Sequence, residues 1–558
     1  METYMEKYLQ WINNIALDEA TRNELASISE DLSEINERFH KDLEFGTGGL
    51  RGIIGAGTNR MNIYTVRRAA RGLADYILAT TKDGKKRGVA ISYVCRHFSK
   101  EFALQTALVL ASCGIKSYLF DALRPTPVLS FAVRKLNCIA GVMVTASHNP
   151  PNYNGYKVYW QDGGQMAHPQ DAQVIEYVNK ILDPATVEIA DYEQAVQTGL
   201  ISFIGQEIDD AYHACVQKLL INIDCITKMT DDFVIVYSPF YGCGTAPMKR
   251  ALSEAGFTNV CLVSEQSAPN PDFPTLKYPN PEDPSAFELA LRLGADKNAD
   301  IILATDPDAD RVGAMVKNSQ GEYELLNGNS VGILLMEYIL TQRKHKNPGV
   351  VSTFVSTRLA KIIAEHNGAK YTETFTGFKN IAASIATWEK GTCTQFVFGF
   401  EESFGYLAGD FVRDKDGISA GMLLCEVAAY YKSHKKTLFD ALSDIYEKYG
   451  YHKELTYSIT LPGLDGAQKM KNMVAGLRSN PPLSVAGIEI ERITDYALHE
   501  NPSDMLYFTL SDKSWFCIRP SGTEPKIKIY FGATGKANKC ASDNLQSLSS
   551  AVLSLLGQ

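Results

Sequence analysis

Hydrophobic and polar positions along the chain repeat one design three times. Each copy is a short apolar run, a polar turn, an amphipathic segment with a helical period, and a second apolar run. The amphipathic segments stop at Gly114, Gly256 and Gly368. Glycine suits this place because the residue after a helix often needs a positive φ. The pattern therefore predicts three similar units of strand, helix and strand.

One more apolar strand follows each unit and runs directly into a polar loop. The three strands are "IAGVMVTA", "ADIILAT" and "TQFVFGF", and the loops that follow them are "SHNP", "DPDADR" and "EESFGY". Strands that alternate with helices predict α/β layers. In such sheets, ligands gather beyond the carboxyl ends of the strands. We therefore expect three similar domains whose polar loops face one cleft.

The end of the chain follows another pattern. It begins with the strand "ELTYSITLPG", continues with a helix from about residue 465 to 477 and further strands, and closes with a helix. The fold class predicted for the whole chain is α/β: three similar mixed α/β domains plus a smaller C-terminal α+β domain around a central cleft. The expected boundaries give four domains: 1–203, 204–320, 321–450 and 451–558.

Composition supports this division and narrows the function. With 558 residues the chain is too long for a single core. Hydrophobic residues make up 45% and charged residues 21%, which is ordinary for a globular protein. The formal net charge of −9 argues against general nucleic-acid binding, which needs a basic face. It leaves a small anionic substrate open, because a local cluster of Lys and Arg can focus potential.

Cysteine usage and hydropathy indicate the compartment. The 11 cysteines occur singly, without a C-x-x-C pair, which favours reduced thiols over a disulfide scaffold or a zinc site. The start of the chain is charged and lacks the apolar core of a signal peptide. No stretch approaches the ~20 apolar residues of a membrane span. We expect a cytoplasmic protein that binds neither membranes nor nucleic acid.

The loop "DPDADR" is a candidate metal site. Asp306, Asp308 and Asp310 alternate after a strand, and such residues point the same way if the loop is extended. Without a cation, the three carboxylates would raise one another's pKa. Oxygen ligands favour Mg²⁺ or Ca²⁺. An EF-hand is excluded, because Arg311 and Lys317 stand where it needs Gly and Glu. The alternative is a solvated acidic turn.

Two further loops are candidates for binding an anion. Glycines surround Arg51 in "EFGTGGLRG" and would let backbone N–H groups approach an anion. Neither the dinucleotide fingerprint nor the P-loop pattern is met there, and a flexible turn remains open. The loop "RPSGTEPK" offers Arg519, Ser521, Gly522 and Thr523 as a phosphate cradle, with a surface turn as the alternative.

The remaining loops could hold a sugar and a nucleophile. Glu401 and Ser403 lie two residues apart after a strand, where they could face vicinal hydroxyls; a helix start is the competing interpretation. Ser147 does not sit in a G-x-S-x-G elbow. His148 is adjacent in sequence and need not touch the Ser147 oxygen as a triad base would. A serine near metal-binding acids suits phosphoryl transfer, whereas a capped turn before proline is equally compatible with this loop alone.

Taken together, five motifs resemble one superfamily. "GLRG", "TASHNP", "DPDADR", "GFEESFGY" and "RPSGTEPK" are similar in sequence and order to the α-D-phosphohexomutases, most closely the phosphoglucomutase/phosphomannomutase enzymes. The resemblance spans residues 44 to about 530. It implies a four-domain α/β enzyme that moves phosphate between O1 and O6 of a hexose. A phosphoserine and a sugar 1,6-bisphosphate would be the intermediates.

The resemblance also implies a role for each motif. Ser147 would carry the phosphoryl group and join Asp306, Asp308 and Asp310 as a Mg²⁺ ligand. Basic residues near the phosphoserine would assist charge and proton transfer: Arg51, His148 and Lys157. Contacts to the substrate would come from Arg311, Thr376, Gly377, Lys379, Glu401, Ser403, Arg519, Ser521, Gly522 and Thr523.

One position departs from the family. Tyr406 stands where many bacterial members have a histidine in the sugar loop, so a proton-transfer role there is in doubt. Lys415 could supply it instead. The expected substrates are glucose phosphates and then mannose phosphates, with glucose 1,6-bisphosphate as activator and intermediate.

Other functions stay open at this point. A phosphopentomutase is the alternative within the class. A sugar-phosphate phosphatase with Asp306 as nucleophile, and a non-catalytic sugar-phosphate binder, are the alternatives outside it. We expect sugar phosphates as the only partners, and a monomer or homodimer.

Overall fold

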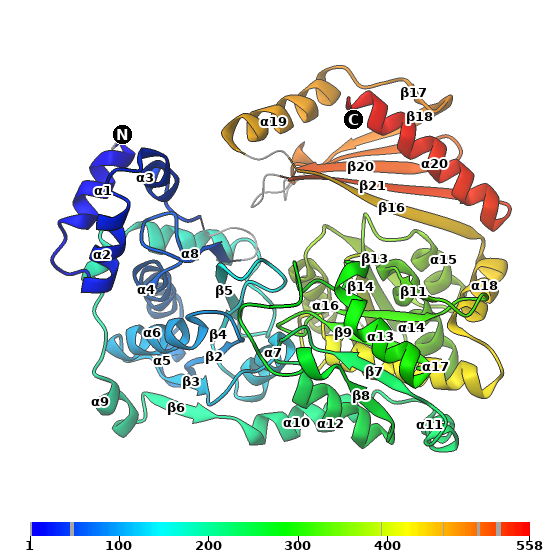
Figure 1. Cartoon of the computed structure of the whole chain (residues 1–558), viewed down its shortest axis with the longest axis horizontal. Coiled ribbons are helices and arrows are strands. Elements are labelled where there is room, and N and C mark those ends of the chain that lie inside the picture. Colours follow the sequence, from blue (N-terminus) through cyan, green and yellow to red (C-terminus); the bar gives the residue numbers. More distant parts are fainter. Residues whose placement is uncertain are drawn as a thin grey trace.

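Four sheet-centred bodies make up the chain (Figure 1). The computed structural model describes residues 3–44, 49–391, 393–460, 463–498, 503–520 and 526–557. The first three bodies lie side by side, and the fourth, coloured orange to red, lies above them. The predicted fold class is confirmed: three similar α/β sheets are followed by a C-terminal α+β body.

The first sheet has six strands in the order β1-β5-β4-β2-β3-β6. Its strands are β1 (Leu50–Ile53), β2 (Val89–Tyr93), β3 (Ser117–Phe120), β4 (Ala140–Val144), β5 (Tyr153–Trp160) and β6 (Ile201–Ile204). Its longer helices are α4 (Ile63–Thr80), α6 (Ser99–Ser112), α7 (Thr126–Lys135) and α8 (Gln170–Asn179), with short α5 (Gly84–Arg87) and α9 (Tyr192–Gln197). Neighbouring residues of β2 point to opposite faces: Ala90 joins the core under α7, and Ile91 joins the core under α4 and α6. Helices therefore cover both faces.

The second and third sheets repeat this plan. The strands are β7 (Ile235–Ser238), β8 (Val260–Leu262), β9 (Ile301–Thr305), β10 (Val312–Lys317), β11 (Tyr323–Leu326), β12 (Pro348–Thr353), β13 (Lys370–Thr374), β14 (Gln395–Glu401) and β15 (Gly405–Ala408). In each body a central strand, β2, β7 or β12, is parallel to both neighbours. One of those neighbours, β4, β9 or β14, then pairs with an antiparallel strand. The three predicted polar loops are thus equivalent hairpin connections. Strand β11 belongs to the second sheet, so this sheet extends beyond residue 320, near which the sequence predicts the boundary between the second and third domains.

The helices of these two bodies are α10 (Gln206–Gln217), α11 (Ile223–Met229), α12 (Thr245–Ala255), α13 (Glu288–Lys297), α14 (Gly328–Gln342), α15 (Leu359–His366), α16 (Phe378–Gly391), α17 (Gly417–Ser433) and α18 (Leu438–Tyr449). The sequence predicts the ends of two of them, α12 and α15, and of α6 in the first body. The three predicted stop residues, Gly114, Gly256 and Gly368, have φ of 70°, 102° and 69°. These values favour glycine, and they confirm the assigned helix ends.

The fourth body is an antiparallel sheet in the order β16-β21-β20-β19-β18-β17. Its elements are β16 (Tyr451–Thr460), α19 (Gly463–Ser479), β17 (Ser484–Val485), β18 (Ile488–Asp495), β19 (Leu506–Leu510), β20 (Trp515–Pro520), β21 (Lys526–Gly535) and α20 (Asn538–Leu555). Residues of α19 and α20 share one core with the strands, so both helices lie on the same face.

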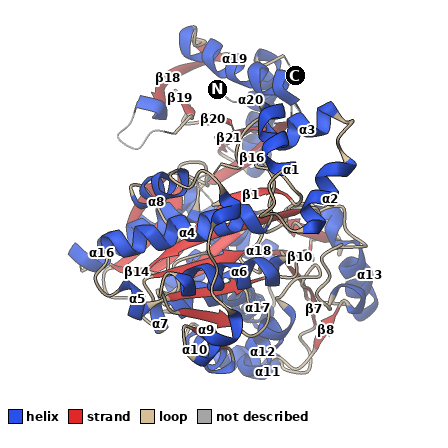
Figure 2. Cartoon of the chain, turned by 90° about the vertical axis from the view of Figure 1, so that its left-hand side faces the viewer, coloured by secondary structure: helices blue, strands red, loops and turns tan. Residues whose placement is uncertain are grey.

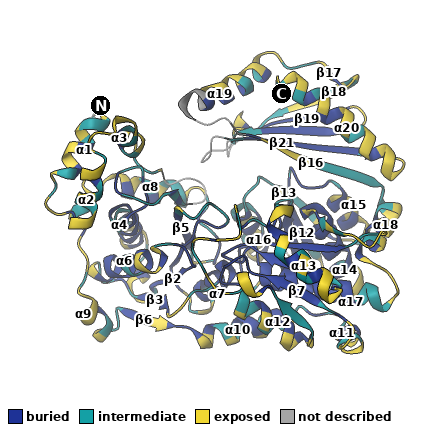
Figure 3. Cartoon of the chain, in the orientation of Figure 1, coloured by how far each residue is buried: buried dark blue, intermediate teal, exposed yellow. Residues whose placement is uncertain are grey.

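The cores divide the molecule unevenly. One continuous core runs from Ala90 on β2 to Ile445 on α18 and joins the first three bodies. Central strands of each sheet are buried, while edge strands such as β13 and β18 and the outer sides of the helices are intermediate or exposed (Figure 3). The fourth body has its own core and stands apart in a second view (Figure 2). It rests on the third body through a small group that we call the aromatic seat: Phe354, Val355, Phe375, Tyr496, Met505, Tyr507, Trp515, Cys517 and Tyr530.

Three short helices precede the first sheet: α1 (Tyr4–Ile12), α2 (Glu19–Ser27) and α3 (Leu32–Phe39). They pack around Trp11 and Phe39, against Tyr64 of α4. None of the helices in the described ranges combines the length and apolarity that crossing a membrane requires. All 11 cysteines are free, as the reduced-thiol prediction expects.

Candidate active site

Strand β4 delivers Ser147 to a tight turn before β5. The residue is buried and has a φ of 51°, a left-handed conformation that non-glycine residues seldom adopt. Its backbone N–H donates to Thr145 Oγ1 at 2.9 Å. Its hydroxyl donates to Asp306 Oδ2 at 2.7 Å and lies 3.2 Å from His148 Nδ1. The turn therefore aims the Ser147 oxygen at the acidic loop of the second body.

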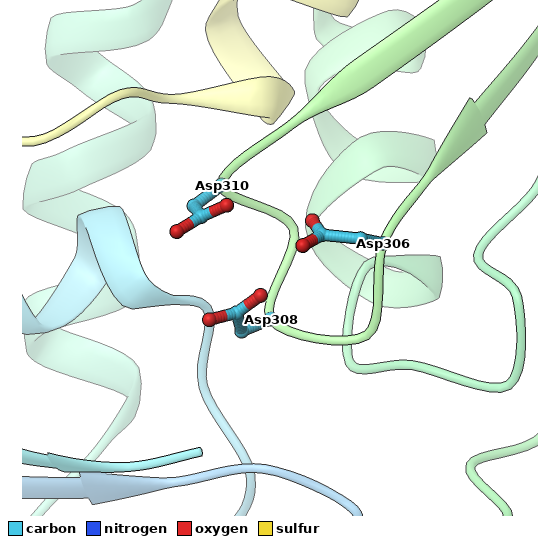
Figure 4. A group of neighbouring side chains, drawn as sticks. All are labelled: Asp306, Asp308 and Asp310. Carbon is cyan, nitrogen blue, oxygen red and sulfur yellow. The ribbon is translucent and has the colours of Figure 1, made fainter. Parts of the chain in front are cut away.

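The acidic loop brings its three carboxylates together, as predicted. Asp306, Asp308 and Asp310 are buried and point toward one another, with potential ligand atoms within 4.8 Å (Figure 4). The reason differs from the one that the sequence suggested. The segment is a turn rather than an extended loop, and Ala309 has a φ of 48°. The turn, and not strand-like alternation, gathers the carboxylates.

A divalent cation fits this cluster. Burial, followed by the charges of Asp308 and Asp310, raises the pKa of Asp306 well above its ordinary value. Asp308 Oδ1 and Asp310 Oδ1 are buried and have no hydrogen-bond partner in the described part of the chain. Buried polar atoms normally have partners. Oxygen ligands without partners are the donors that a hard ion such as Mg²⁺ takes.

Two lysines partly neutralise the cluster. Lys157 Nζ lies 3.0 Å from Asp308 Oδ2 and 3.4 Å from Asp310 Oδ2, and Lys415 Nζ lies 2.6 Å from Asp310 Oδ2. Burial opposes ionisation of Asp308, but the charges of Lys157 and Lys415 and the hydrogen bonds with Asp306 and Lys157 together lower the pKa of this carboxyl below its usual range. Burial also disfavours charge on Lys415, yet Asp310 raises its pKa, so this lysine is a cation at neutral pH. Three lysine–carboxylate contacts thus converge on the acidic cluster.

The other predicted basic residues lie around the same turn. Arg51 donates to Asn149 Oδ1 at 2.9 Å. Arg311 donates its backbone N–H to Asp306 at 3.1 Å and its guanidinium to Glu282 at 2.6 Å. Burial, followed by the charges of Arg311 and Arg51, lowers the pKa of His148 well below 6.5. His148 is therefore neutral near pH 7, which favours proton exchange over a cationic role.

The sugar loop occupies the equivalent hairpin of the third body. Glu401 ends β14 and accepts the backbone N–H of Gly377 at 2.7 Å, and this contact joins the two predicted sugar segments. Tyr406 is fully buried, and its hydroxyl donates to the carbonyl of Gly328 at 3.2 Å. Its side chain lies in the core that the first three bodies share and does not line the cleft. Lys415 lies in the cleft, as the alternative requires.

Lys379 lies apart from the other predicted residues. Its ammonium group pairs with Asp171 of α8 at 3.1 Å and so links the third body to the first. It lines a neighbouring groove of about 210 Å³ with Trp160 and Met166. The structure therefore does not bring Lys379 to the cleft that holds Ser147.

The fourth body contributes two cations. Arg519 of β20 stands opposite Lys528 of β21 in the antiparallel register, and both line the cleft. The predicted partners Ser521, Gly522 and Thr523 lie outside the described residues. Lys528 was not predicted. The alternation in "KIKIY", which places Lys528 and Tyr530 on one face, could have indicated it.

These residues meet in one cleft of about 270 Å³. It is lined by Arg51, Ser147, Lys157, Gln165, Asp310, Arg311, Thr376, Gly377, Phe378, Glu401, Glu402, Ser403, Lys415, Arg519, Lys528 and Tyr530. Six of these side chains are basic and three are acidic. All four bodies contribute, so an acidic protein encloses a locally basic site suited to a phosphorylated ligand.

The second set of missed residues lies behind the metal loop. Thr126 Oγ1 donates to Asp308 Oδ2 at 3.1 Å, and Thr145 Oγ1 donates to the same atom at 3.2 Å. Arg96 binds the backbone of the Ser147 turn. The two threonine contacts join the first body to the second, and the Arg96 contact joins segments of the first body that are 51 residues apart. No local motif marks them.

Comparison with protein families covers most of the chain. Models described as phosphoglucomutase/phosphomannomutase alpha/beta/alpha domains I, II and III match residues 42–184, 210–321 and 327–449. The model of the C-terminal domain of the same family matches residues 471–542.

Individual proteins agree with this match. The chain is 37% identical over 517 residues to a phosphoglucomutase of Staphylococcus aureus (strain MRSA252), covering 90% of this chain and 92% of that protein. A putative phosphomannomutase from Thermus thermophilus has a similar fold, with a TM-score of 0.69, 23% identity, and coverage of 93% of this chain and 100% of that one. The open form of parafusin, a phosphoglucomutase from Paramecium, matches with a TM-score of 0.69, 19% identity, and coverage of 92% and 95%. From the four domain matches and the identity along nearly its whole length, the chain belongs to the phosphoglucomutase/phosphomannomutase family.

Proposed function

We propose that this protein is a phosphohexomutase that interconverts hexose 1-phosphate and hexose 6-phosphate. Glucose phosphates are the first expected substrates and mannose phosphates the second. One observation carries the proposal: the Ser147 hydroxyl lies 2.7 Å from Asp306 in a cleft that also holds Glu401 and Arg519. The name of the Staphylococcus aureus relative supports glucose. We expect the enzyme to act in the cytoplasm, as a monomer or homodimer.

The reaction would proceed through a phosphorylated Ser147. The free hydroxyl of the substrate attacks the phosphorus atom, the bond to Ser147 Oγ breaks, and the hydroxyl proton leaves to a nearby base. His148, neutral and 3.2 Å from Oγ, is placed to exchange that proton with the serine oxygen. Lys157 and Lys415 offset the negative charge that the loose transition state spreads over the phosphoryl oxygens.

A divalent ion would complete the charge balance. Asp306, Asp308 and Asp310, together with Ser147, would hold Mg²⁺, and the bound ion would supply charge neutralisation at the phosphoryl group. Asp308 Oδ1 and Asp310 Oδ1, which lack a hydrogen-bond partner among the described residues, support this assignment.

The far side of the cleft would serve the second half of the reaction. The product of the first transfer is a hexose 1,6-bisphosphate, which must turn around before its other phosphoryl group returns to Ser147. Arg519 and Lys528 would hold whichever phosphate is not reacting, while Glu401 and Ser403 would bind the sugar in both orientations. Closure of the fourth body would exclude water, which would otherwise hydrolyse the phosphoserine. Glucose 1,6-bisphosphate would therefore be both activator and intermediate.

The alternatives fit these contacts less well. In a phosphatase Asp306 would be the nucleophile, but both of its oxygens are engaged, one by Ser147 and the other by the Arg311 amide. A non-catalytic binder would have no use for the convergence on Ser147. A phosphopentomutase uses the same chemistry, and only an assay separates it from a hexose enzyme.

Two measurements test the proposal. Intact mass followed by peptide mapping should place a phosphoryl group on Ser147 after incubation with glucose 1,6-bisphosphate. Coupled assays with glucose 1-phosphate, mannose 1-phosphate and ribose 1-phosphate should give isomerised product in that order of rate. Release of free phosphate faster than isomerisation would establish a phosphatase, and turnover of none of the three would leave a binder.

A further inference from the structure

Arg96 lies beneath the Ser147 turn, outside the residues that line the cleft. It sits in the loop between β2 and α6 and is only 4% exposed. Its two terminal nitrogens donate to four backbone carbonyls of one turn. Nη2 donates to Ser147 and Asn149, each at 2.5 Å, and Nη1 donates to Pro150 at 2.7 Å and Tyr153 at 3.2 Å. One guanidinium thus fixes the backbone on both sides of the reactive serine.

This arrangement suits a turn that would not hold its shape alone. Ser147 has a φ of 51°, which costs of order 1–3 kcal/mol for a residue with a side chain unless its surroundings enforce it. Four carbonyl oxygens directed at one cation provide such enforcement. Only a planar group with several fixed N–H donors can bind four carbonyls at once, because a lysine offers three donors on a single atom.

Arg96 also ties the turn to the second body. Its guanidinium lies over the ring of Phe273, 5.0 Å from the centroid. On either side of it, Cys95 Sγ donates to the carbonyl of Tyr241 at 3.0 Å, and His97 pairs with Asp272 at 2.7 Å. In the segment 95–97, Arg96 therefore contacts the serine turn, and all three residues contact the second body. The second body carries the acidic loop, so the distance between Ser147 and Asp306 depends on this segment.

The charge of Arg96 has no anionic partner of its own. No ion pair of Arg96 occurs within the described ranges, and its Nε is buried without a hydrogen-bond partner. Burial lowers the pKa of Arg96 to about 10, so the group remains a cation at neutral pH. A buried, unpaired cation is costly. Here its field favours a negative charge on the turn above it.

We propose that Arg96 is a positioning residue that holds the Ser147 turn against the acidic loop in the geometry that phosphoryl transfer requires. It acts through the backbone of residues 147–153 and touches neither substrate nor the reacting atoms. This inference rests on the proposed function, in which Ser147 carries the phosphoryl group.

The test combines a truncation with chemical rescue. Arg96→Ala should lower kcat by about 100-fold while KM changes by less than about threefold, because a misplacement of about 1 Å has a cost of that order. Added guanidinium ion should restore at least about tenfold of the lost kcat by occupying the vacated site. Arg96→Lys should fall between the wild type and Arg96→Ala, since it keeps the charge but not the four-way contact.

Arg87→Ala is the matched control. Arg87 also donates to backbone carbonyls of the first body, those of Asn137 and Cys138, but far from Ser147 in the described structure. Its removal should leave kcat within about twofold and give no response to guanidinium. A guanidinium effect on both variants would mean a general effect of the ion and would overturn the inference.

The remaining outcomes are decisive as well. Folded Arg96→Ala with kcat within threefold of wild type would overturn the proposal, as would a loss of activity that guanidinium does not repair. If Arg96→Ala does not fold, Arg96→Lys carries the test, and wild-type kcat in that variant would be the contrary result. Phosphate mapping on the wild type separates the two levels. No phosphate on Ser147 there would refute the proposed function, whereas phosphorylated wild type with unimpaired Arg96 variants would refute this inference alone.

Discussion

The two ends of the cleft are held with different firmness. At the reactive end Asp308 is fully buried and accepts hydrogen bonds from Thr126, Thr145 and Lys157. At the distal end Arg519 and Lys528 are only half-buried, at the ends of strands whose sheet has a separate core. The first end belongs to the continuous packing of three bodies, and the second reaches the cleft through the aromatic seat.

The difference matches what each end has to do. Charge stabilisation is effective when donors and cations are fixed before the reaction, because they then need no reorganisation. In the proposed mechanism the distal end would accept a phosphate from either end of a bisphosphate, which would require adjustment. Its attachment is correspondingly small: Arg358 donates to the carbonyl of Lys513 at 3.0 Å and to the hydroxyl of Tyr507 at 3.1 Å. Rigid chemistry and adaptable binding are thus assigned to separate bodies.

Removing the phosphoryl carrier should break the reactive end completely. Ser147→Ala should lower kcat by at least about 10⁴-fold, as loss of a nucleophile does in other enzymes. Coupled assay of the purified, folded variant measures this. Ser112→Ala, at an exposed position in the same body, should keep full activity. Activity of the Ser147 variant above a few per cent of wild type would rule out the serine mechanism.

Altering one carboxylate should disable the same end without unfolding it. Asp308→Asn should lower kcat by about 10²–10³-fold, because one fixed charge aimed at the transition state is lost. The free energy of unfolding should change by less than about 2 kcal/mol, since the amide keeps an acceptor oxygen. A chelator should bring wild-type activity down to a similar level.

Asp300→Asn is the control for that variant. Asp300 lies in the same body as Asp308 and pairs with Lys432 of α17. It should be dispensable for kcat. Equal losses of kcat and of stability in Asp308→Asn would mean that the acidic cluster is structural.

The distal end should respond in KM instead. Arg519→Ala should raise KM by about 10- to 50-fold, which corresponds to one charge-assisted contact, with kcat falling less than about fivefold. Steady-state kinetics with glucose 1-phosphate separates the two constants. Lys536→Ala, on an exposed part of the same body, is the control. A lower kcat with unchanged KM would show that Arg519 acts on the chemical step, which would contradict the assignment of Arg519 to the distal end.

The smallest effect is expected at the junction of the two ends. Burial, then the charge of Glu401, raises the pKa of Glu402 to about 6 from 4.5, with Lys528 acting in the other direction. The folded state therefore prefers the protonated form. The resulting stability is complete below pH 4.5 and is lost as pH rises through 6.

Glu402→Gln should remove that loss. Between pH 4.5 and pH 7, the free energy of unfolding of the variant should fall by about 1 kcal/mol less than that of the wild type, after allowance for solvent screening. Urea unfolding at the two pH values measures this. Parallel curves for wild type and variant would show that folding does not raise the pKa of Glu402. Glu365→Gln, at an exposed position of α15, controls for loss of a carboxylate.

Sequence and structure agree most where the signal is local. The helix stops at Gly114, Gly256 and Gly368 follow from glycine's freedom at positive φ, and the three polar loops follow from apolar strands that end abruptly. Alternation predicts the acidic cluster from an extended loop, whereas in the structure a turn at Ala309 brings the carboxylates together. Three clustered carboxylates predict a bound cation whether the loop is extended or turned.

The agreement ends where a contact joins segments that are distant in sequence. Lys379 was assigned to the sugar by motif, yet its partner is Asp171, some two hundred residues earlier in the chain. Arg96 carries no motif, since four backbone carbonyls leave no trace in the side chains they belong to. The sequence puts a proton-transfer role at Tyr406 in doubt, and the hydrogen bond of its hydroxyl to Gly328 and its place in the core show where the side chain lies. Such placements depend on packing, which periodicity does not encode.

The aromatic seat contains a tryptophan that can serve as an intrinsic fluorescence probe. Trp515 is one of four tryptophans, stacks on Tyr507 at 5.2 Å between ring centroids, and has the Arg358 guanidinium over its ring. It lies on β20, the strand that also carries Arg519. Movement of the fourth body would change the polarity and the quenching around this indole, so its emission could follow opening and closing in real time without an added dye.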